Sequence, residues 1–136
     1  MSLDPHAYFE DVLVFLLGAS AYAETLGDPL EYRFGEDLAL LEAAIGYEDS
    51  SRIHIHLLVD TSSGYPDVRH YSYHFEDSSG QTLFRYDNSR HHPELPHFPN
   101  HKHEGPLETC KPSQLPSLRR LQTEIQDKLR RIRLPR

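Results

Sequence analysis

Two runs of alternating residues, 52–60 and 69–76, constrain the fold of this chain more than any other feature. Every second side chain is aliphatic in the first run and mostly aromatic in the second, the two-residue period of a β-strand. A short turn-forming segment follows each run, and residues 82–86 make a third strand-like run. Strands joined by such short turns pair antiparallel. The sequence therefore predicts an antiparallel sheet of three or more strands within residues 51–86.

Both ends of the chain carry apolar side chains three and four residues apart, which is typical of amphipathic helices. Asp4-Pro5 is a typical helix start, and it predicts an N-terminal helix over residues 5–18. An arginine-rich pattern predicts a basic C-terminal helix over about residues 117–132. Residues 36–46 have helical propensity but run into a turn, and we favour a strand and hairpin there. The predicted fold class is α+β, an antiparallel sheet flanked by N- and C-terminal helices.

The chain of 136 residues suits one domain, 1–136. Its single cysteine, Cys110, excludes an internal disulfide, and we assign it no role. No apolar run is long enough to span a membrane, and no secretion signal is visible. We therefore expect a cytoplasmic protein without a membrane partner, for which a homodimer is one option.

The net charge of −7 is unevenly distributed. Residues 1–60 hold twelve acidic and two basic side chains, whereas residues 118–136 hold seven basic and two acidic ones. An acidic protein is a poor general binder of nucleic acid, but a local basic helix can still contact phosphates. The charge pattern leaves RNA open as a partner.

Residues 87–116 form a histidine- and proline-rich segment after the last predicted strand. Five histidines fall between His91 and His103, with three prolines among them. Proline fixes φ and removes a backbone donor, so we expect neither a helix nor a central strand there. We expect a stiff loop that turns back across the sheet and gathers its imidazoles, with Asp87 and His74, around one cleft.

One interpretation of this loop is a metal site, with zinc as the candidate ion. Two imidazoles from alternate residues of an extended segment can chelate one ion, which makes His101 and His103 a candidate pair. His91, His92, His97 and Asp87 are the candidates to complete the ligand set, with His91 and His97 preferred.

The other interpretation is proton transfer on RNA, which requires no cofactor. Such cleavage needs a base for the 2′-hydroxyl, an acid for the leaving 5′-oxygen and a cation for the developing charge. The candidate catalytic residues are His92, His101, Lys102 and His103. Candidates for stacking on bases and for contacting phosphate are Tyr73, Arg85, Tyr86, Arg90 and Phe98. The supporting residues are His74, Asp87 and Asn88.

Five short motifs follow one another at tight spacing between residues 65 and 105. They are Tyr71-Ser72-Tyr73-His74, Asp77-x-x-Gly80, Phe84-Arg85-Tyr86-Asp87-Asn88, His91-His92-Pro93-Glu94 and Phe98-Pro99-Asn100-His101-Lys102-His103. In this order they resemble the TumE family, small bacterial and archaeal proteins taken as the toxin half of toxin–antitoxin pairs. That family commonly has a histidine where this chain has Asn100, so we do not expect position 100 to be an indispensable ligand or base.

The resemblance implies a type II toxin that inhibits growth and is held in check by a helix-turn-helix antitoxin. RNA as its target is inferred from the side chains and not from the resemblance. The alternative is a non-catalytic module in which the same histidine loop holds a metal or docks a partner protein.

Overall fold

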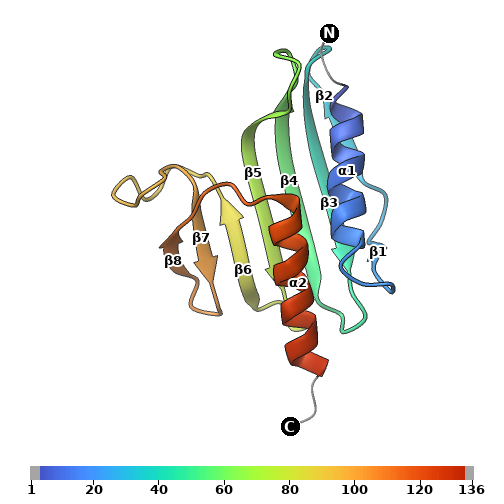
Figure 1. The fold of residues 1–136 in the computed structure, drawn as a ribbon, viewed down its shortest axis with the longest axis vertical. Coiled ribbons are helices and arrows are strands. Elements are labelled where there is room, and N and C mark those ends of the chain that lie inside the picture. The colour runs from blue at the N-terminus through green and yellow to red at the C-terminus, as the bar shows by residue number, and fades with distance from the viewer. Residues whose placement is uncertain (1–3, 134–136) are drawn as a thin grey trace.

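The computed structural model describes residues 4–133, and in this part of the chain an eight-stranded antiparallel sheet carries two helices (Figure 1). The helices are α1 (Pro5–Leu17) and α2 (Leu118–Arg133). The strands are β1 (Glu24–Thr25), β2 (Leu30–Arg33), β3 (Leu38–Gly46), β4 (Arg52–Asp60), β5 (Asp67–Glu76), β6 (Thr82–Asp87), β7 (His101–Glu104) and β8 (Thr109–Pro112). Neither helix of the described residues is long and apolar enough to cross a membrane.

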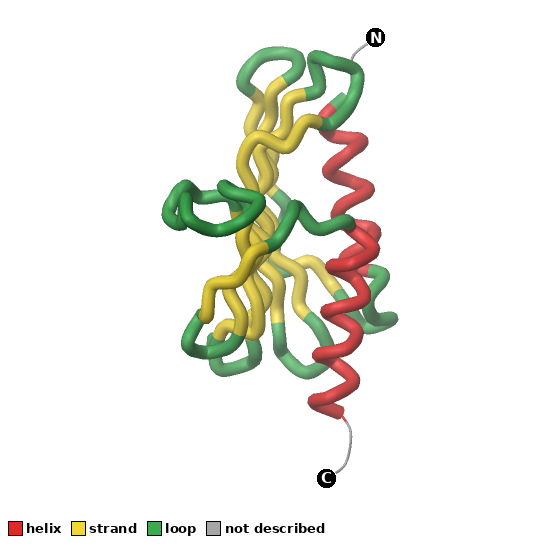
Figure 2. Tube along the Cα trace, turned by 60° about the vertical axis from the view of Figure 1, so that its left-hand side comes forward, coloured by secondary structure: helices red, strands yellow, loops and turns green. Residues whose placement is uncertain are grey.

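Strands β3 to β8 follow one another across the sheet in chain order, and each is antiparallel to the next. β1 and β2 both pair with β3. Ile53 of β4 lies opposite Phe75 of β5, so the two alternating runs pair as predicted. Both helices lie on the same side of the sheet (Figure 2). The predicted α+β architecture is confirmed.

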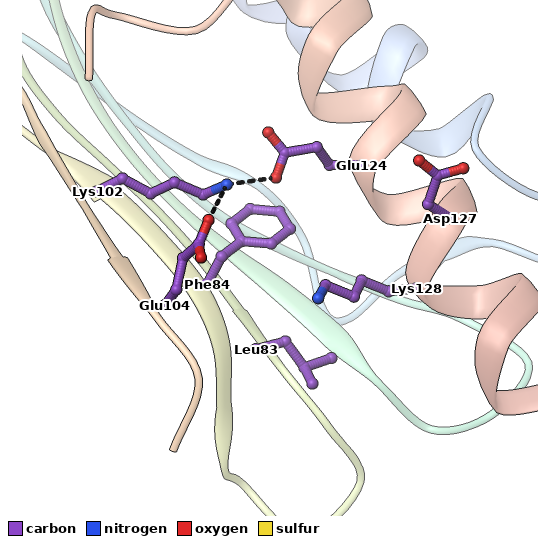
Figure 3. Close-up of a pocket in the computed structure, with 7 residues that line it drawn as sticks. All are labelled: Leu83, Phe84, Lys102, Glu104, Glu124, Asp127 and Lys128. Carbon is purple, nitrogen blue, oxygen red and sulfur yellow. Dashed lines mark hydrogen bonds and ion pairs between the residues drawn. The ribbon is translucent and has the colours of Figure 1, made fainter. Parts of the chain in front are cut away.

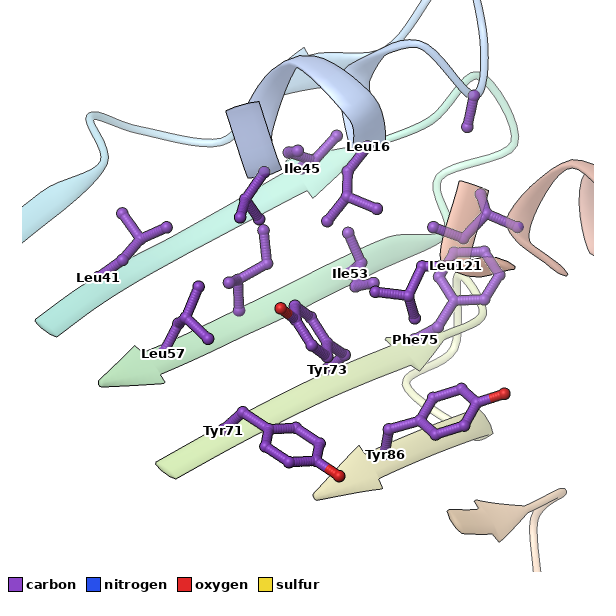
Figure 4. Close-up of a cluster of buried hydrophobic side chains, with 14 of the residues drawn as sticks. Leu16, Leu41, Ile45, Ile53, Leu57, Tyr71, Tyr73, Phe75, Tyr86 and Leu121 are labelled. Carbon is purple, nitrogen blue, oxygen red and sulfur yellow. The ribbon is translucent and has the colours of Figure 1, made fainter. Parts of the chain in front are cut away.

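The core lies between the two helices and the inward face of the central strands (Figure 4). From α1 it takes Phe9, Val12 and Leu16, and from α2 it takes Leu121 and Ile125, all fully buried. Alternate residues of β3 to β6 complete it. Burying one such side chain contributes roughly 1.5–3 kcal/mol. The predicted helix stripes and strand alternation therefore face each other across a single core.

The helix ends lie within one residue of their predicted positions. Asp4 caps α1 by accepting a hydrogen bond from the backbone of His6, and Ser117 Oγ accepts one from the backbone of Arg120 at the start of α2. The ambiguous residues 36–46 do contain a strand, β3, because its alternate side chains are needed under α1.

The prediction of one long loop over residues 87–116 is wrong in its second half. β7 and β8 lie within this segment, and β7 is bonded to β6 on one side and β8 on the other. The three prolines that argue against a strand all precede residue 100, so His101–Glu104 can donate to both neighbours. Pro112 ends the edge strand β8, where a missing donor is tolerated.

Candidate functional site

The outer strands place a group of polar side chains on the face of the sheet opposite the helices. His101 pairs with Asp87, and His103 pairs with Arg85 on one side and Cys110 on the other. Directly paired residues point to the same side of a sheet. The intervening residue Tyr86 lies in the core under the helices, so these five side chains share the opposite, open face.

A sixth residue, His92, reaches this group from the loop between β6 and β7. Its ring lies 5.5 Å from that of His101 and 6.2 Å from that of His103, and the last two rings are 4.9 Å apart. We call Arg85, Asp87, His92, His101, His103 and Cys110 the histidine site.

The loop that carries His92 is fixed at both ends. Asn88 accepts a hydrogen bond from the backbone of Tyr71 and donates one to the carbonyl of Arg69, which ties the start of the loop to β5. The Tyr71 hydroxyl donates to Asn100 Oδ1 at 2.9 Å, just before β7. Asn88 therefore positions the loop, and Asn100 acts as a hydrogen-bond acceptor there.

Asp87 is the buried carboxylate of the histidine site. Its Oδ1 accepts from the backbone and hydroxyl of Ser89 at 3.1 and 2.8 Å, and its Oδ2 accepts from Arg85 Nε at 3.1 Å. Burial acts to raise the pKa of Asp87, but the Ser89 hydrogen bonds and the charges of His101 and Arg85 outweigh it and lower that pKa. Asp87 is therefore ionised at neutral pH.

The two strand histidines have defined tautomers when they are neutral. His101 Nδ1 lies 2.9 Å from the Pro99 carbonyl oxygen, and His103 Nδ1 lies 3.2 Å from that of Glu108. A carbonyl oxygen only accepts, so each Nδ1 carries a proton and each Nε2 is left with a lone pair. These Nε2 atoms lie 2.8 Å from Oδ1 and 3.8 Å from Oδ2 of Asp87.

His103 favours the neutral form. Burial lowers its pKa most, and the neighbouring Arg85 charge lowers it further, against a raising effect from its bond to Glu108. His101 is only 2% exposed, so it contacts solvent far less than His92.

Cys110 is a member of the site that the sequence interpretation left without a role. One donor atom each from Cys110, His101 and His103 lie within 4.8 Å of one another. The sequence shows no sign of the strand β8. If residues 109–112 had been recognised as a strand paired with β7, Cys110 would have been placed opposite His103.

Arg85 and Arg90 supply cations near the open face. Besides Asp87, Arg85 contacts Glu108 through Nη1 at 3.0 Å. The Arg90 guanidinium lies 5.5 Å from the centre of the Phe98 ring, so these two loop residues form a cation–π pair.

Lys102 reaches towards Glu124 of α2 (Figure 3). The strand register places it on the other side of the sheet from His101 and His103. Its Nζ donates to Glu124 of α2 at 2.8 Å and lies 2.9 Å from Glu104. Burial acts to lower the pKa of Lys102, but these two carboxylates outweigh it and raise the pKa. The structure therefore separates Lys102 from the imidazoles with which it was grouped.

The remaining candidates are dispersed. Tyr73 and Tyr86 are core residues with at most 1% of their surface exposed, so neither offers a ring to a base. His91 is exposed, and His97 lines a separate hollow with Arg120 and residues 112–117. His74 is on the open face opposite Arg85 and bonds to Thr82 Oγ1 at 2.8 Å. Of the proposed metal ligands, the structure brings together His101 and His103, with His92 and Asp87 beside them, and it leaves His91 and His97 apart.

Comparison with curated proteins and with solved structures finds no match to this chain. A family model described as Toxin TumE matches residues 17–133, which include the whole sheet, α2 and the histidine site but only the last residue of α1. The match covers well over half of the chain and agrees with the resemblance seen in the motifs. The chain belongs to the TumE toxin family.

Proposed function

We propose that this chain is the toxin of a type II toxin–antitoxin pair and that it stops growth by cleaving RNA at the histidine site. Membership of a toxin family implies an antitoxin partner, and we propose a helix-turn-helix protein of the cytoplasm in that role. The observation that carries the proposal is the convergence of three imidazoles with Asp87 and Arg85 on one face of the sheet.

The chemistry proposed is attack of an RNA 2′-oxygen on the adjacent phosphorus. A base takes the 2′-hydroxyl proton, the bond from phosphorus to the 5′-oxygen breaks, and an acid protonates that oxygen, leaving a 2′,3′-cyclic phosphate. His92 is the accessible imidazole for one of these proton transfers. His103 can perform the other where no metal ion is bound.

Arg85 takes the role first given to Lys102. Its guanidinium lies on the open face beside the imidazoles and can balance charge on the phosphorane. Phe98, which is 37% exposed and sits under Arg90, offers a flat surface for an unpaired base.

A second candidate is the non-catalytic module, in which the same cluster holds a metal ion. The grouping of His101, His103 and Cys110 donors favours it. The two candidate functions are distinguished by whether the purified protein cleaves RNA.

The test compares two neighbouring loop residues. Induced expression of the wild type without its partner should arrest growth, and purified wild type should cleave RNA. His92→Ala should lose both activities, whereas His91→Ala, an exposed neighbour outside the ring cluster, should keep both. Circular dichroism must show that both variants fold. Folded wild type that leaves RNA intact, with and without divalent metal, overturns the proposal.

A further inference from the structure

We propose that His101, His103 and Cys110, with the Asp87 carboxylate beside them, bind one divalent transition-metal ion of the zinc class. This goes beyond the proposed function, because such a site stands whether or not RNA is the target.

The first argument is the orientation of the two rings. Each Nδ1 is committed to a backbone carbonyl, so both Nε2 lone pairs remain available. A histidine that ligates a metal almost always donates its other ring N–H to a carbonyl or carboxylate in this way. His101 and His103 already have the tautomer and the restraint that a ligand needs.

The second argument is the environment of His101 Nε2. His101 is 98% buried, and its Nε2 makes no hydrogen bond within residues 4–133. Asp87 Oδ1 lies 2.8 Å away without the alignment of a hydrogen bond. The buried Nε2 therefore has no hydrogen-bond partner among the described residues, which is unfavourable for a polar atom. A cation bound at Nε2 would satisfy this atom and lie close to the Asp87 carboxylate.

The third argument is the donor set and its spacing. Ligands around tetrahedral zinc lie roughly 3.3–3.6 Å apart, given bond lengths of about 2.0–2.1 Å to nitrogen and 2.3 Å to sulfur. One donor atom from each of the three side chains lies within 4.8 Å of the other two, so the set would have to draw together by about 1 Å to reach tetrahedral spacing. Two imidazoles and a thiolate favour zinc over magnesium or calcium, which prefer oxygen ligands.

The strands explain why these donors meet. The registers of β6, β7 and β8 bring Asp87, His101, His103 and Cys110 to one face from residues up to 23 positions apart. Cys110 and His103 are both partly exposed, which gives an ion a way in from the open face. A bound ion occupies His101 and His103 and leaves His92 as the accessible imidazole.

The experiment is a titration of chelator-treated, full-length protein with Co²⁺. We expect one equivalent to bind, with a thiolate-to-cobalt charge-transfer band, the visible absorption of tetrahedral cobalt, and displacement by Zn²⁺. Cys110→Ser should abolish the charge-transfer band, and His103→Ala should weaken binding at least about tenfold. Both residues are partly exposed, so these variants are expected to fold, which circular dichroism checks.

The matched controls are His91→Ala and His97→Ala, two histidines from the same segment outside the group. They should bind Co²⁺ as the wild type does. A wild type that binds no Co²⁺, or a charge-transfer band that survives Cys110→Ser, overturns the proposal. So does loss of binding in the control variants, which would place the ion in the loop.

These readings are made without RNA, so they separate the two proposals. If the protein binds Co²⁺ but does not cleave RNA, the metal site stands and the ribonuclease proposal fails. If it cleaves RNA but does not bind Co²⁺, the ribonuclease proposal stands and the metal site fails.

Discussion

Asp87 holds the histidine site together through both of its carboxylate oxygens. It accepts hydrogen bonds from Ser89 at the start of the loop and from Arg85 on its own strand. It also faces His101 on the next strand. The turn formed by Asp87 and Ser89 occurs a second time in the chain, at Asp77 and Ser79. Asp77 accepts from the backbone and hydroxyl of Ser79 with the same two-residue spacing, but in an exposed hairpin away from the histidines.

The first prediction compares the same substitution in these two turns. Asp87→Asn replaces an ionised acceptor of Arg85 and should lower the free energy of unfolding by about 1–3 kcal/mol. It should also abolish growth arrest, because the His101 and Arg85 side chains lose their shared carboxylate. Asp77→Asn should cost less stability and leave growth arrest intact. Urea denaturation and induced expression measure the two effects. Equal behaviour of the two variants would contradict a special role for Asp87.

The second prediction separates the two faces of the sheet. Lys102→Ala leaves Glu124 without its lysine partner under α2 and should lower the free energy of unfolding by about 1–3 kcal/mol. Growth arrest should persist, since Lys102 does not reach the open face. Arg85→Ala should instead lose growth arrest. The same denaturation and expression measurements apply, and loss of toxicity in a folded Lys102→Ala protein would return Lys102 to the active centre.

At the level of single elements, the strands that could be predicted from the sequence are those with alternating apolar side chains. The alternation in β4 and β5 was visible because their inward residues, such as Ile55 and Tyr73, pack in the core. β7 and β8 lack that signal, since their helix-facing positions carry Lys102, Glu104 and Lys111, joined by ion pairs instead of apolar packing. The site was incomplete for the same reason, because without β8 nothing paired Cys110 with a histidine.

The third prediction concerns the contact between β4 and β5. Glu76 of β5 accepts from Arg52 at 2.6 Å and contacts His54 at 2.8 Å on β4. Burial acts to raise the pKa of Glu76, but the bonds from His54 and Arg52 outweigh it and lower the pKa below its ordinary 4.5.

A lowered pKa means that the folded state holds the proton less tightly than the unfolded chain. The contribution of Glu76 to stability is thus present above about pH 4.5 and is lost as the pH falls through its folded value. Glu76→Gln should flatten this acid limb in urea denaturation from pH 6 to pH 3. An unchanged acid limb in Glu76→Gln would contradict the assignment.

On the scale of the whole molecule, the apolar core and the histidine site lie over different strands. The core residues come from the helices, β3 to β6 and the residues Ala19 and Tyr47 just beyond α1 and β3, and none comes from residues 101–112. Regions with few buried apolar contacts open locally at lower free energy than the core does. The site is therefore built partly on two strands, β7 and β8, that contribute no side chain to the apolar core.

The fourth prediction follows from this division. In hydrogen exchange of metal-free protein, backbone amides of β7 and β8 should exchange faster than those of β4 and β5. Zinc binds the closed site and not the opened one, so it should stabilise the closed state by about 2.7 kcal/mol at a free concentration one hundred times its Kd. Exchange should then slow about a hundredfold at β7 and β8, up to the limit set by global unfolding, while Cys110→Ser shows no such slowing. Uniform slowing over the whole sheet would mean that the outer strands already open only with the core. No slowing at β7 and β8 at saturating zinc would instead mean that the ion does not join them.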